Sequence, residues 1–450
     1  RDLVRNNPWA RHGLKRIVTN TVGWGIKPKA VGPSAPQIMD LWRRWGETTE
    51  CDATGRMNFY GLQKLVMRTL VESGEVIIRR RRRLPTDGLS VPLQLQVLEP
   101  DYIDSDKEGK GVAGGPIING IEFDGIGRRV AYWLFNEHPG STHGAIAPVS
   151  TRVPADGILH VFDQERPGQA RGTPWFASVD VRLHDFAEFE DATLVKQKIA
   201  ACMAAFVTDI DGGGTPLAGD GGTDASSGAS VDVFEPGSIL SLPPGKTVTV
   251  ANPPQATDHQ SFSTTALRGV AAGLGVTFED LTGDYSQVNY SSARMGRLSH
   301  AADVHDWRWN ILVPQFCAPA WDWMLEAAIA DAGVSVSAEA AEWTPPPAQM
   351  LDPEKEGAAL KNAVRTGLIT PDDMVREQGY DPEQHWPAYA ASFQRLDKLG
   401  IVLDCDARKT NSSGQQQADP TAEKPADQPP TNGTSKPNGA PKPAQPSANV

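Results

Sequence analysis

Five consecutive arginines, Arg79 to Arg83, are the longest run of like charge in this 450-residue chain. Guanidinium groups bind phosphate, so the run could contact the backbone of a nucleic acid. The run sits in EVIIRRRRRL, which predicts a strand, and in a strand at most three of the five side chains share a face. The aromatic residues on which bases stack are missing between the arginines. Two interpretations remain: direct phosphate contact, or a solvated or subunit-interface strand that forms salt bridges.

A glycine-rich segment from Asp209 to Ser230 invites phosphate or calcium chemistry. No GK[ST] follows it, so it is not a nucleotide-binding P-loop. Asp209 and Asp211 fit the first positions of a calcium-binding EF-hand, but Gly213 at position five and Asp220 at position twelve do not. We therefore predict a flexible loop.

The usual patterns of catalytic and metal-binding residues are not found in the sequence. There is no HExxH and no GxSxG, and the carboxylates are scattered, so no two-carboxylate or two-metal site stands out. We predict structural roles for the histidines, among them His138, His143, His160 and His184. The sequence predicts no catalytic residue, no metal site, no cofactor and no enzymatic activity.

The segment DGILHVFDQERPGQARGTPWF, from Asp156 to Phe176, joins a strand-like run to a helix through a dense polar turn. Arg166 and Arg171 flank Gln169 there, which would hold two guanidinium groups at the corner between strand and helix. Pro174 then opens the helix, at a position where its missing N–H costs nothing. We single out five residues of this turn as a structural motif: Arg166, Gln169, Arg171, Gly172 and Trp175.

A second polar segment, TGDYSQVNYSSARMGR, runs from Thr282 to Arg297 into another helix. Ser291 or Ser292 as a helix N-cap would account for part of its polarity. The remaining tyrosine, amide, hydroxyl and arginine side chains predict a loop that faces something polar and moving.

Hydrophobic spacing predicts helices over residues 3–26, 38–45, 58–73, 174–207, 261–278 and 291–330, the last interrupted by Pro314 and Pro319. Strands are predicted within 75–104, 119–135, 231–234 and 247–250. Three cap-and-proline pairs predict three C-terminal helices in one compact region: Asp352-Pro353, Thr370-Pro371 and Asp381-Pro382. The helix over 174–207, at 1.5 Å per residue, would be roughly 48 Å long, and its single apolar stripe needs partners.

Charge divides the chain into two parts. The net charge is −12, but the first 83 residues carry 17 Lys and Arg against 7 Asp and Glu, which leaves −22 for the rest. Such polarity suits a subunit that meets different partners at its ends, or is chance clustering on a solvated surface. Four widely spaced cysteines, no membrane span and no secretion signal indicate a reducing cytoplasm. Residues 406–450 have almost no apolar side chains, which predicts a disordered tail.

Four blocks resemble the lambda-type family of tailed-bacteriophage portal (head-tail connector) proteins, in that family's order: RNNPWARHGLKRIVTNTVGWGI, HVFDQERPGQARGTPWF, GVTFEDLTGDYSQVNYSSARMGR and LDPEKEGAALKNAVRTGLITPDDMVREQGYD. The family's usual stretch before the first block is missing, and the glycine-rich insertion and the polar tail depart from its pattern. The resemblance implies a mostly helical α+β portal fold that assembles as a cyclic ring of about twelve subunits.

By resemblance, the ring lies at the portal vertex of the virion capsid and is assembled in the host bacterial cytoplasm. It is the channel for packaging and ejection of double-stranded DNA. Its implied partners are the terminase packaging motor, a head-tail adaptor, and major capsid and scaffold proteins, with no membrane. The alternatives are a head-tail adaptor or minor capsid protein that docks on a separate portal and, more remotely, a DNA-processing enzyme.

The resemblance also implies a division into wing, stem, clip and crown. The expected parts are wing 1–173, first stem helix 174–207, clip 208–258, second stem helix 259–275, tunnel loop and following wing helices 276–342, helical crown 343–405 and tail 406–450. The candidates for facing the tunnel and its DNA are Asp284, Tyr285, Gln287, Asn289, Tyr290, Ser291, Arg294, Lys196 and Lys198.

Overall fold

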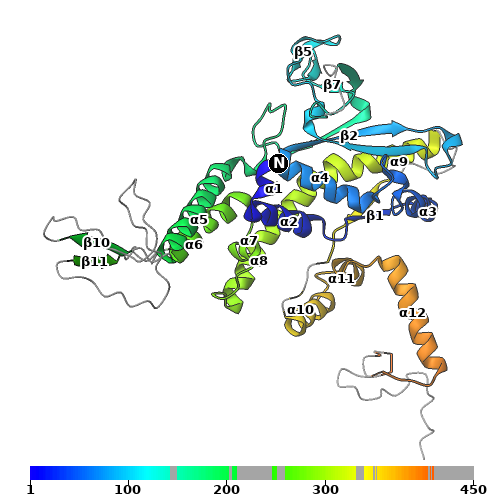
Figure 1. Ribbon diagram of the computed structural model, residues 1–450. Coiled ribbons are helices and arrows are strands. Elements are labelled where there is room, and N and C mark those ends of the chain that lie inside the picture. Colours follow the sequence, from blue (N-terminus) through cyan, green and yellow to red (C-terminus); the bar gives the residue numbers. More distant parts are fainter. Residues whose placement is uncertain are drawn as a thin grey trace, which may run out of the picture. The chain divides into compact units, whose positions relative to one another are not determined.

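The computed structural model describes residues 1–141, 149–201, 205–209, 246–250, 259–330, 339–347, 350, 352–403, 406 and 408–409. The chain divides into a first unit, Arg1–Tyr380, and a second unit, Asp381–Val450. The described part is a mostly helical α+β fold, as the sequence predicts (Figure 1). None of its helices combines the length and the apolar character needed to span a bilayer.

Four helices open the first unit: α1 (Asp2–Asn6), α2 (Pro8–Val22), α3 (Ala35–Trp45) and α4 (Phe59–Ser73). The side chains of Asn7 and Asn58 accept hydrogen bonds from N–H groups in the first turns of α2 and α4. Gly74 ends α4 in the left-handed conformation, with a φ of 84°. The predicted N-terminal helices are confirmed, and the first of them is broken at Asn7.

Aromatic side chains fill the core of the first unit. Trp42 and Trp45 from α3 and Phe59 from α4 are fully buried. The ring of Phe59 stacks on Phe316 with centroids 5.2 Å apart, and Trp42 lies 5.3 Å from Trp321. Segments more than 250 residues apart in sequence therefore share one core.

Two antiparallel sheets follow α4. The first has the order β3 (Leu93–Leu98), β2 (Glu75–Arg82) and β9 (Ile158–Phe162). The second contains five consecutive strands: β4 (Gly109–Lys110), β5 (Gly114–Ile118), β6 (Ile121–Asp124), β7 (Arg129–Phe135) and β8 (Ser150–Pro154). β2 packs on α4, and β9 brings residues from the far side of the second sheet back against β2. The strands predicted in 75–104 and 119–135 are confirmed.

Short 3₁₀ helices connect these elements: η1 (Thr49–Cys51), η2 (Pro85–Asp87), η3 (Pro100–Tyr102), η4 (Ala155–Gly157) and η5 (Trp175–Ser178). A further two-stranded sheet pairs β1 (Lys27–Ala30) with β12 (Ala341–Thr344). This sheet joins the segment that follows α2 to a segment more than 300 residues later in the chain.

Two helices, α5 (Asp180–Ala201) and α6 (His259–Leu274), pack side by side (Figure 1). The predicted helix over 174–207 is wrong at both ends. Residues 175–178 form η5 because Phe176 and Val179 turn into the core, 5% and 2% exposed. Residues 205–209 are the strand β10 (Ala205–Asp209), which pairs with β11 (Lys246–Val250), so α5 has 22 residues and a length of roughly 33 Å.

A long helical stretch follows α6 and returns to the core. It contains α7 (Phe278–Thr282), α8 (Tyr290–Asp306), the π-helical segment η6 (Trp307–Cys317) and α9 (Ala318–Ala330). The predicted interruption at Pro314 and Pro319 is wrong. The chain stays helical and widens to π-helical turns around Pro314, which accommodate a residue without an N–H, and Pro319 lies just after the π-helical segment, where α9 continues from η6.

The three predicted C-terminal helices are confirmed as α10 (Pro353–Arg365), α11 (Pro371–Glu377) and α12 (Pro382–Lys398). Asp352, Thr370 and Asp381 cap them, each side chain accepting from an N–H of the first turn. α10 and α11 belong to the first unit and α12 to the second, so the compact region predicted there is divided.

Several sequence predictions fall outside the described residues. These are the flexible loop and most of the clip, the strand at 231–234, the role of His143, and the disordered tail apart from residues 406, 408 and 409.

Candidate functional site at the base of α5

A buried carboxylate, Glu75, organises the polar turn that precedes α5. Glu75 begins β2 directly after the left-handed Gly74, and the residue is 3% exposed. His160 Nε2 lies 2.8 Å from Oε2, Arg171 Nε lies 2.7 Å from Oε1, and the backbone N–H of Gly172 donates to Oε2 at 2.9 Å. These donors satisfy both oxygens of the carboxylate. We call Glu75, His160, Arg171 and Gly172 the clasp.

The turn itself is ordered by Gln169. Its Oε1 accepts from the backbone N–H groups of Glu165 and Arg166, and its Nε2 donates to the carbonyl of Arg171 at 2.8 Å. Arg171 Nη1 also donates to Ser105 Oγ at 3.2 Å. The clasp therefore joins α4, the three-stranded sheet and the loop that leads into the five-stranded sheet.

Close backbone packing at Gly74 and Gly172 brings the turn against the end of α4. A Cβ at Gly74 would lie closer than 3.0 Å to the backbone of Thr173 and Pro174, and a Cβ at Gly172 equally close to the Gly74 carbonyl. Trp175, the first residue of η5, then packs on Trp307 of η6 with ring centroids 5.2 Å apart. The start of α5 is thus held by backbone contact, by ionic hydrogen bonds and by an aromatic pair.

The clasp perturbs the pKa of both titratable partners. Burial alone would raise the pKa of Glu75, but hydrogen bonds from His160 and Arg171 outweigh it and lower the pKa to about 2. Burial lowers the pKa of His160 below its ordinary value of 6.5, against the pull of Glu75. At neutral pH the carboxylate is therefore ionised and only accepts, and the neutral imidazole carries its proton on Nε2.

We expect the clasp to make the protein sensitive to acid in two steps. Below pH 6.5 the unfolded chain protonates His160 while the buried ring stays neutral, so stability falls as the pH decreases. Below pH 4.5 the unfolded Glu75 is protonated while the folded one stays charged down to about pH 2, which removes about 3 kcal/mol more. Urea unfolding measured across this pH range checks both steps.

His160→Gln should abolish the first step, whereas substitution of the exposed His184 should leave it; an unchanged profile in His160→Gln would contradict the assignment.

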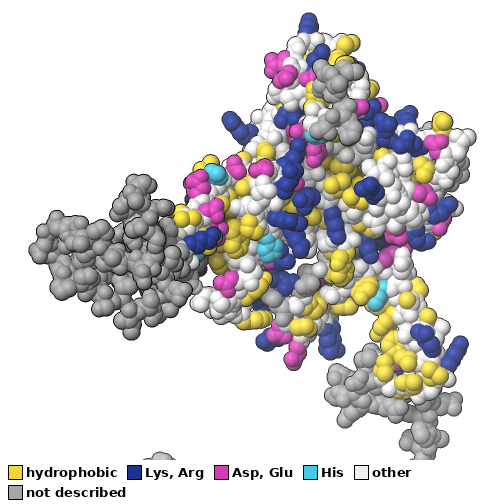
Figure 2. All heavy atoms as spheres, viewed as in Figure 1, with side chains coloured by type: hydrophobic (Ala, Val, Ile, Leu, Met, Phe, Trp, Pro, Cys, Tyr) yellow, Lys and Arg dark blue, Asp and Glu magenta, His cyan; other side chains and the backbone are white. Residues whose placement is uncertain are grey.

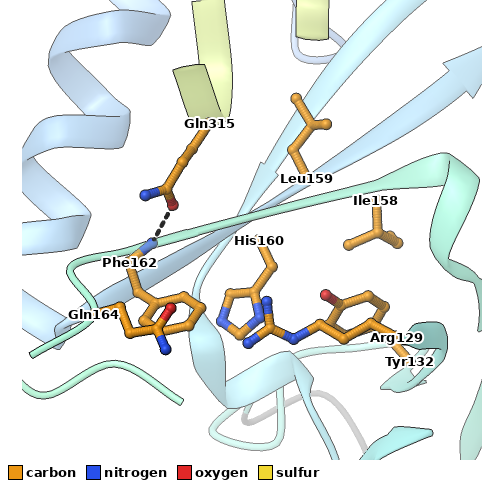
Figure 3. A pocket seen from close by; sticks show the side chains of 8 residues that line it. All are labelled: Arg129, Tyr132, Ile158, Leu159, His160, Phe162, Gln164 and Gln315. Carbon is orange, nitrogen blue, oxygen red and sulfur yellow. Dashed lines mark hydrogen bonds between the residues drawn. The ribbon is translucent and has the colours of Figure 1, made fainter. Parts of the chain in front are cut away.

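A cavity of about 300 Å³ lies beside His160, between β9, β7 and η6 (Figure 3). Arg129 lies over the ring of Phe162, 5.1 Å from its centroid, and Gln315 Oε1 accepts from the Phe162 N–H at 3.1 Å. The eight residues around the cavity are Arg129, Tyr132, Ile158, Leu159, His160, Phe162, Gln164 and Gln315. They include no nucleophile beside a base, so the cavity is a junction between sheets with no reactive constellation.

The other predicted chemical groups have structural partners. The side chain of Arg80 is 7% exposed and donates a hydrogen bond to Glu326 of α9 at 2.7 Å. This arginine of the run from Arg79 to Arg83 therefore forms an ion pair within the chain. The ring of His138 lies 3.0 Å from Glu99. Among the described residues, Glu99, Asp101 and His138 form a group close enough together to hold a metal ion. The guanidinium of Arg1 already pairs with both of these carboxylates.

The predicted tunnel loop is an exposed turn between α7 and α8. Tyr285 and Tyr290 are 60% and 49% exposed. Asn289 caps α8 in a reciprocal pair with Ser292, so the prediction of Ser291 or Ser292 as the N-cap is wrong: the amide oxygen of Asn289 takes that place, three residues before Ser292. The side chains of Asp284, Gln287, Ser291 and Arg294 are likewise exposed or partly exposed. Lys196 and Lys198 are exposed on α5, and within the described residues no hydrogen bond or ion pair joins them to this loop.

The structure therefore brings together part of what the sequence singled out. Gln169, Arg171, Gly172 and Trp175 all take part in or support the clasp, whereas Arg166 contributes its backbone and leaves its side chain exposed. Sequence reasoning missed Glu75. Its signal was an acidic residue placed between a helix-ending glycine and the buried run of β2.

A buried carboxylate that holds a turn in place, and a helical pair that exposes large apolar side chains, are typical of a structural subunit that packs against partners. Residues 1–308 match the profile "Phage portal protein, lambda family", and the chain belongs to that family. The chain is thus a portal protein of a phage-like virion, a structural component and not an enzyme, as the sequence predicts.

Two curated relatives and two solved structures are similar to the chain. The "Probable portal protein" of Halomonas phage phiHAP-1 is 26% identical over 419 residues, covering 89% of this chain and 80% of the relative. "Portal protein B" of Escherichia phage lambda is 23% identical over 329 residues, covering 65% and 61%. The structures "Neck of native GTA particle computed with C12 symmetry" and "Virion of native gene transfer agent (GTA) particle" each match with a TM-score of 0.50, at 17% and 16% identity, covering 85% of this chain and 93% of theirs. They share its fold.

Proposed function

We propose that about twelve copies of this chain close into a ring and that double-stranded DNA passes through the ring during packaging and ejection. The observation that carries the proposal is the apolar surface that α5 and α6 leave uncovered. On α5, Val181 is 71% exposed and Val195 is 53% exposed, and on α6 Phe262 is 47% exposed. Large apolar side chains gathered on one helical pair are typical of a surface that a partner covers.

A neighbouring copy is the partner that best accounts for this surface. α5 and α6 already pack on each other, with the rings of Phe189 and Phe262 4.2 Å apart, and this contact leaves Val181, Val195 and about half of Phe262 exposed. Head-to-tail contacts between identical subunits close into a ring when the rotation between them is right. The twelve-fold symmetry named for the similar neck particle supports a ring of that size.

We also propose the division into parts that the resemblance to the portal family implies. We assign residues 1–173 to the wing, 174–201 to the first stem segment, 205–258 to the clip, because β10 pairs with β11 there, and 259–275 to the second stem helix. Residues 276–342 would supply the tunnel loop and further wing helices, 343–405 the crown and 406–450 the tail. The loop from Asp284 to Arg294, with Lys196 and Lys198, would face the channel. The terminase motor, a head-tail adaptor and capsid and scaffold proteins would dock on the ring.

A pair of substitutions on α5 tests the ring. We expect the purified wild-type chain to form closed particles of about 580 kDa, twelve times 48.5 kDa, by light scattering and negative-stain imaging. Val181→Glu with Val195→Glu should remain monomeric, since each valine loses about 1.5 kcal/mol or more of burial, together over a hundredfold in subunit affinity.

The matched control is Val112→Glu, because Val112 is 86% exposed on a turn beside the five-stranded sheet. This variant should form rings like the wild type. A wild-type chain that stays monomeric at assembly concentrations, or that binds only to another protein's ring, would contradict the proposal and favour an adaptor.

A further inference from the structure

The exposed face of α1, α2 and α4 is strongly basic. These helices pack on one another, and Figure 2 shows Lys and Arg side chains gathered where Figure 1 places them. We call this surface the basic face. Its exposed cations are Arg5, Arg11, Lys15, Lys64 and Arg68.

The cations of the basic face are largely uncompensated. Arg5, Arg11, Lys15 and Lys64 have no carboxylate partner in the part of the chain that the structure describes. Arg68 lies 3.6 Å from Glu72 in a partly exposed pair, a kind of contact worth little. The positive charge is therefore available to a ligand.

The spacing of these cations costs the folded chain some stability. Arg11 and Lys15 are four residues apart on α2, and Lys64 and Arg68 are four apart on α4. Like charges at this spacing lie one above the other on a helix and repel each other. Two neighbouring helices that each carry such a pair indicate a polyanion as the missing counter-charge.

The composition of the basic face favours nucleic acid over a protein partner. α1, α2 and α4, which the structure describes throughout, expose no large hydrophobic side chain. Stable protein interfaces are anchored by such side chains and are depleted in lysine. An exposed aromatic residue, on which single-stranded bases would stack, is also missing from these helices.

We propose that the basic face binds the phosphate backbone of duplex DNA, at a site separate from the channel. Four helical residues advance about 6 Å, close to two base-pair steps of about 3.4 Å each, so the two cations of such a pair can meet alternate phosphates of one strand. The contact is independent of base sequence, because side chains that meet only phosphates read no base edges. This site goes beyond the proposed function, since a ring could conduct DNA without it.

A relaxed, covalently closed DNA circle tests the proposal, because a circle cannot thread a ring that is already closed. We expect the wild-type protein to bind the circle, with a binding constant that falls steeply between about 50 and 200 mM salt. The oligomeric state is measured separately by light scattering, so failure to form rings and failure to bind DNA give different results. A wild-type protein that does not bind the circle would overturn the proposal.

Two triple variants with the same change in net charge then locate the site. Arg11→Gln, Lys15→Gln and Lys64→Gln together should weaken binding about tenfold or more and lower the salt slope by about 2.7, at 0.9 for each lost phosphate contact. Lys110→Gln, Arg128→Gln and Lys361→Gln together remove three exposed cations outside the basic face and the proposed channel residues, and should leave binding and slope unchanged.

Equal behaviour of the two triple variants would rule out the basic face as the site. Polyglutamate at the same charge concentration should compete poorly for the wild-type protein. Competition as strong as that of DNA would overturn the choice of DNA and favour an acidic protein.

Discussion

Replacement of Glu75 by Gln is expected to destabilise the first unit by about 3–5 kcal/mol, because it breaks a buried ion pair and leaves the positive partner in place. Four donor groups converge on this carboxylate, from His160, Arg171 and Gly172. A glutamine offers one acceptor oxygen and turns an NH₂ group toward the others. Arg171, whose side chain is 18% exposed, would keep its charge without a counter-ion.

Urea unfolding at pH 7 measures this loss. Glu108→Gln is the matched control, because Glu108 is exposed and the same chemical change there should alter stability by no more than about 0.5 kcal/mol. Arg171→Lys offers a second check, because lysine keeps the charge but cannot reproduce the forked contact, so an intermediate loss is expected. A Glu75→Gln variant as stable as Glu108→Gln would show that the clasp contributes nothing.

The consequence of the clasp for function is geometric. α5 and α6 are proposed to form the contacts between neighbouring copies, so the direction in which α5 leaves the core would set the rotation from one subunit to the next. Trp175 and Gly172 fix that direction through Trp307 and Gly74. A small change in the angle at which α5 leaves the core would accumulate around a ring, because every contact between neighbouring copies repeats it.

Local sequence signals were sufficient for much of the fold. The caps at Asp352, Thr370 and Asp381 and the glycine that ends α4 depend on neighbouring residues only, so their helices could be predicted. The polar turn was also recognisable, because Gln169 and Arg171 are close in sequence to the glycine and proline that shape it.

Partners distant in sequence account for what was missed. Glu75 lies 85 residues from His160 and 96 from Arg171, and its local signal, a place between Gly74 and the buried run of β2, does not show which side chains it meets. Helical spacing over 174–207 was misleading for a related reason. A 3₁₀ turn can bury Phe176 and Val179 as an α-helix would, and residues 205–209 become a strand only through pairing with 246–250.

The basic face and the proposed channel place opposite demands on charge. A conduit needs weak contacts with DNA, because fixed cations along the bore would resist movement, and the chain beyond its first 83 residues is acidic. The unpaired cations of α1, α2 and α4 are concentrated within those 83 residues. With the basic face separate from the proposed channel, a single subunit could hold DNA at one surface and let it pass at the other.

Gly74→Ala is expected to be the most disruptive single-methyl change at the base of α5. Gly74 has a φ of 84°, where an L residue pays about 1–2 kcal/mol. Its new Cβ would also lie closer than 3.0 Å to the backbone of Thr173 and Pro174, which cannot rotate away as a side chain can. The resulting overpacking adds about 1–3 kcal/mol and pushes the turn off the end of α4.

Gly55→Ala is the control that separates backbone strain from steric contact. Gly55 also has a positive φ, 66°, but a Cβ added there would meet no other atom within 4 Å. Gly55→Ala should therefore lose only the backbone contribution, and the difference between the two variants in urea unfolding measures the steric contact with Thr173. In the ring assay, Gly74→Ala should reduce the yield of closed particles more than its stability loss explains, since displacement of the turn redirects α5. Equal stability losses in the two variants would mean that the turn yields freely, and the clasp could not then set the direction of the helix.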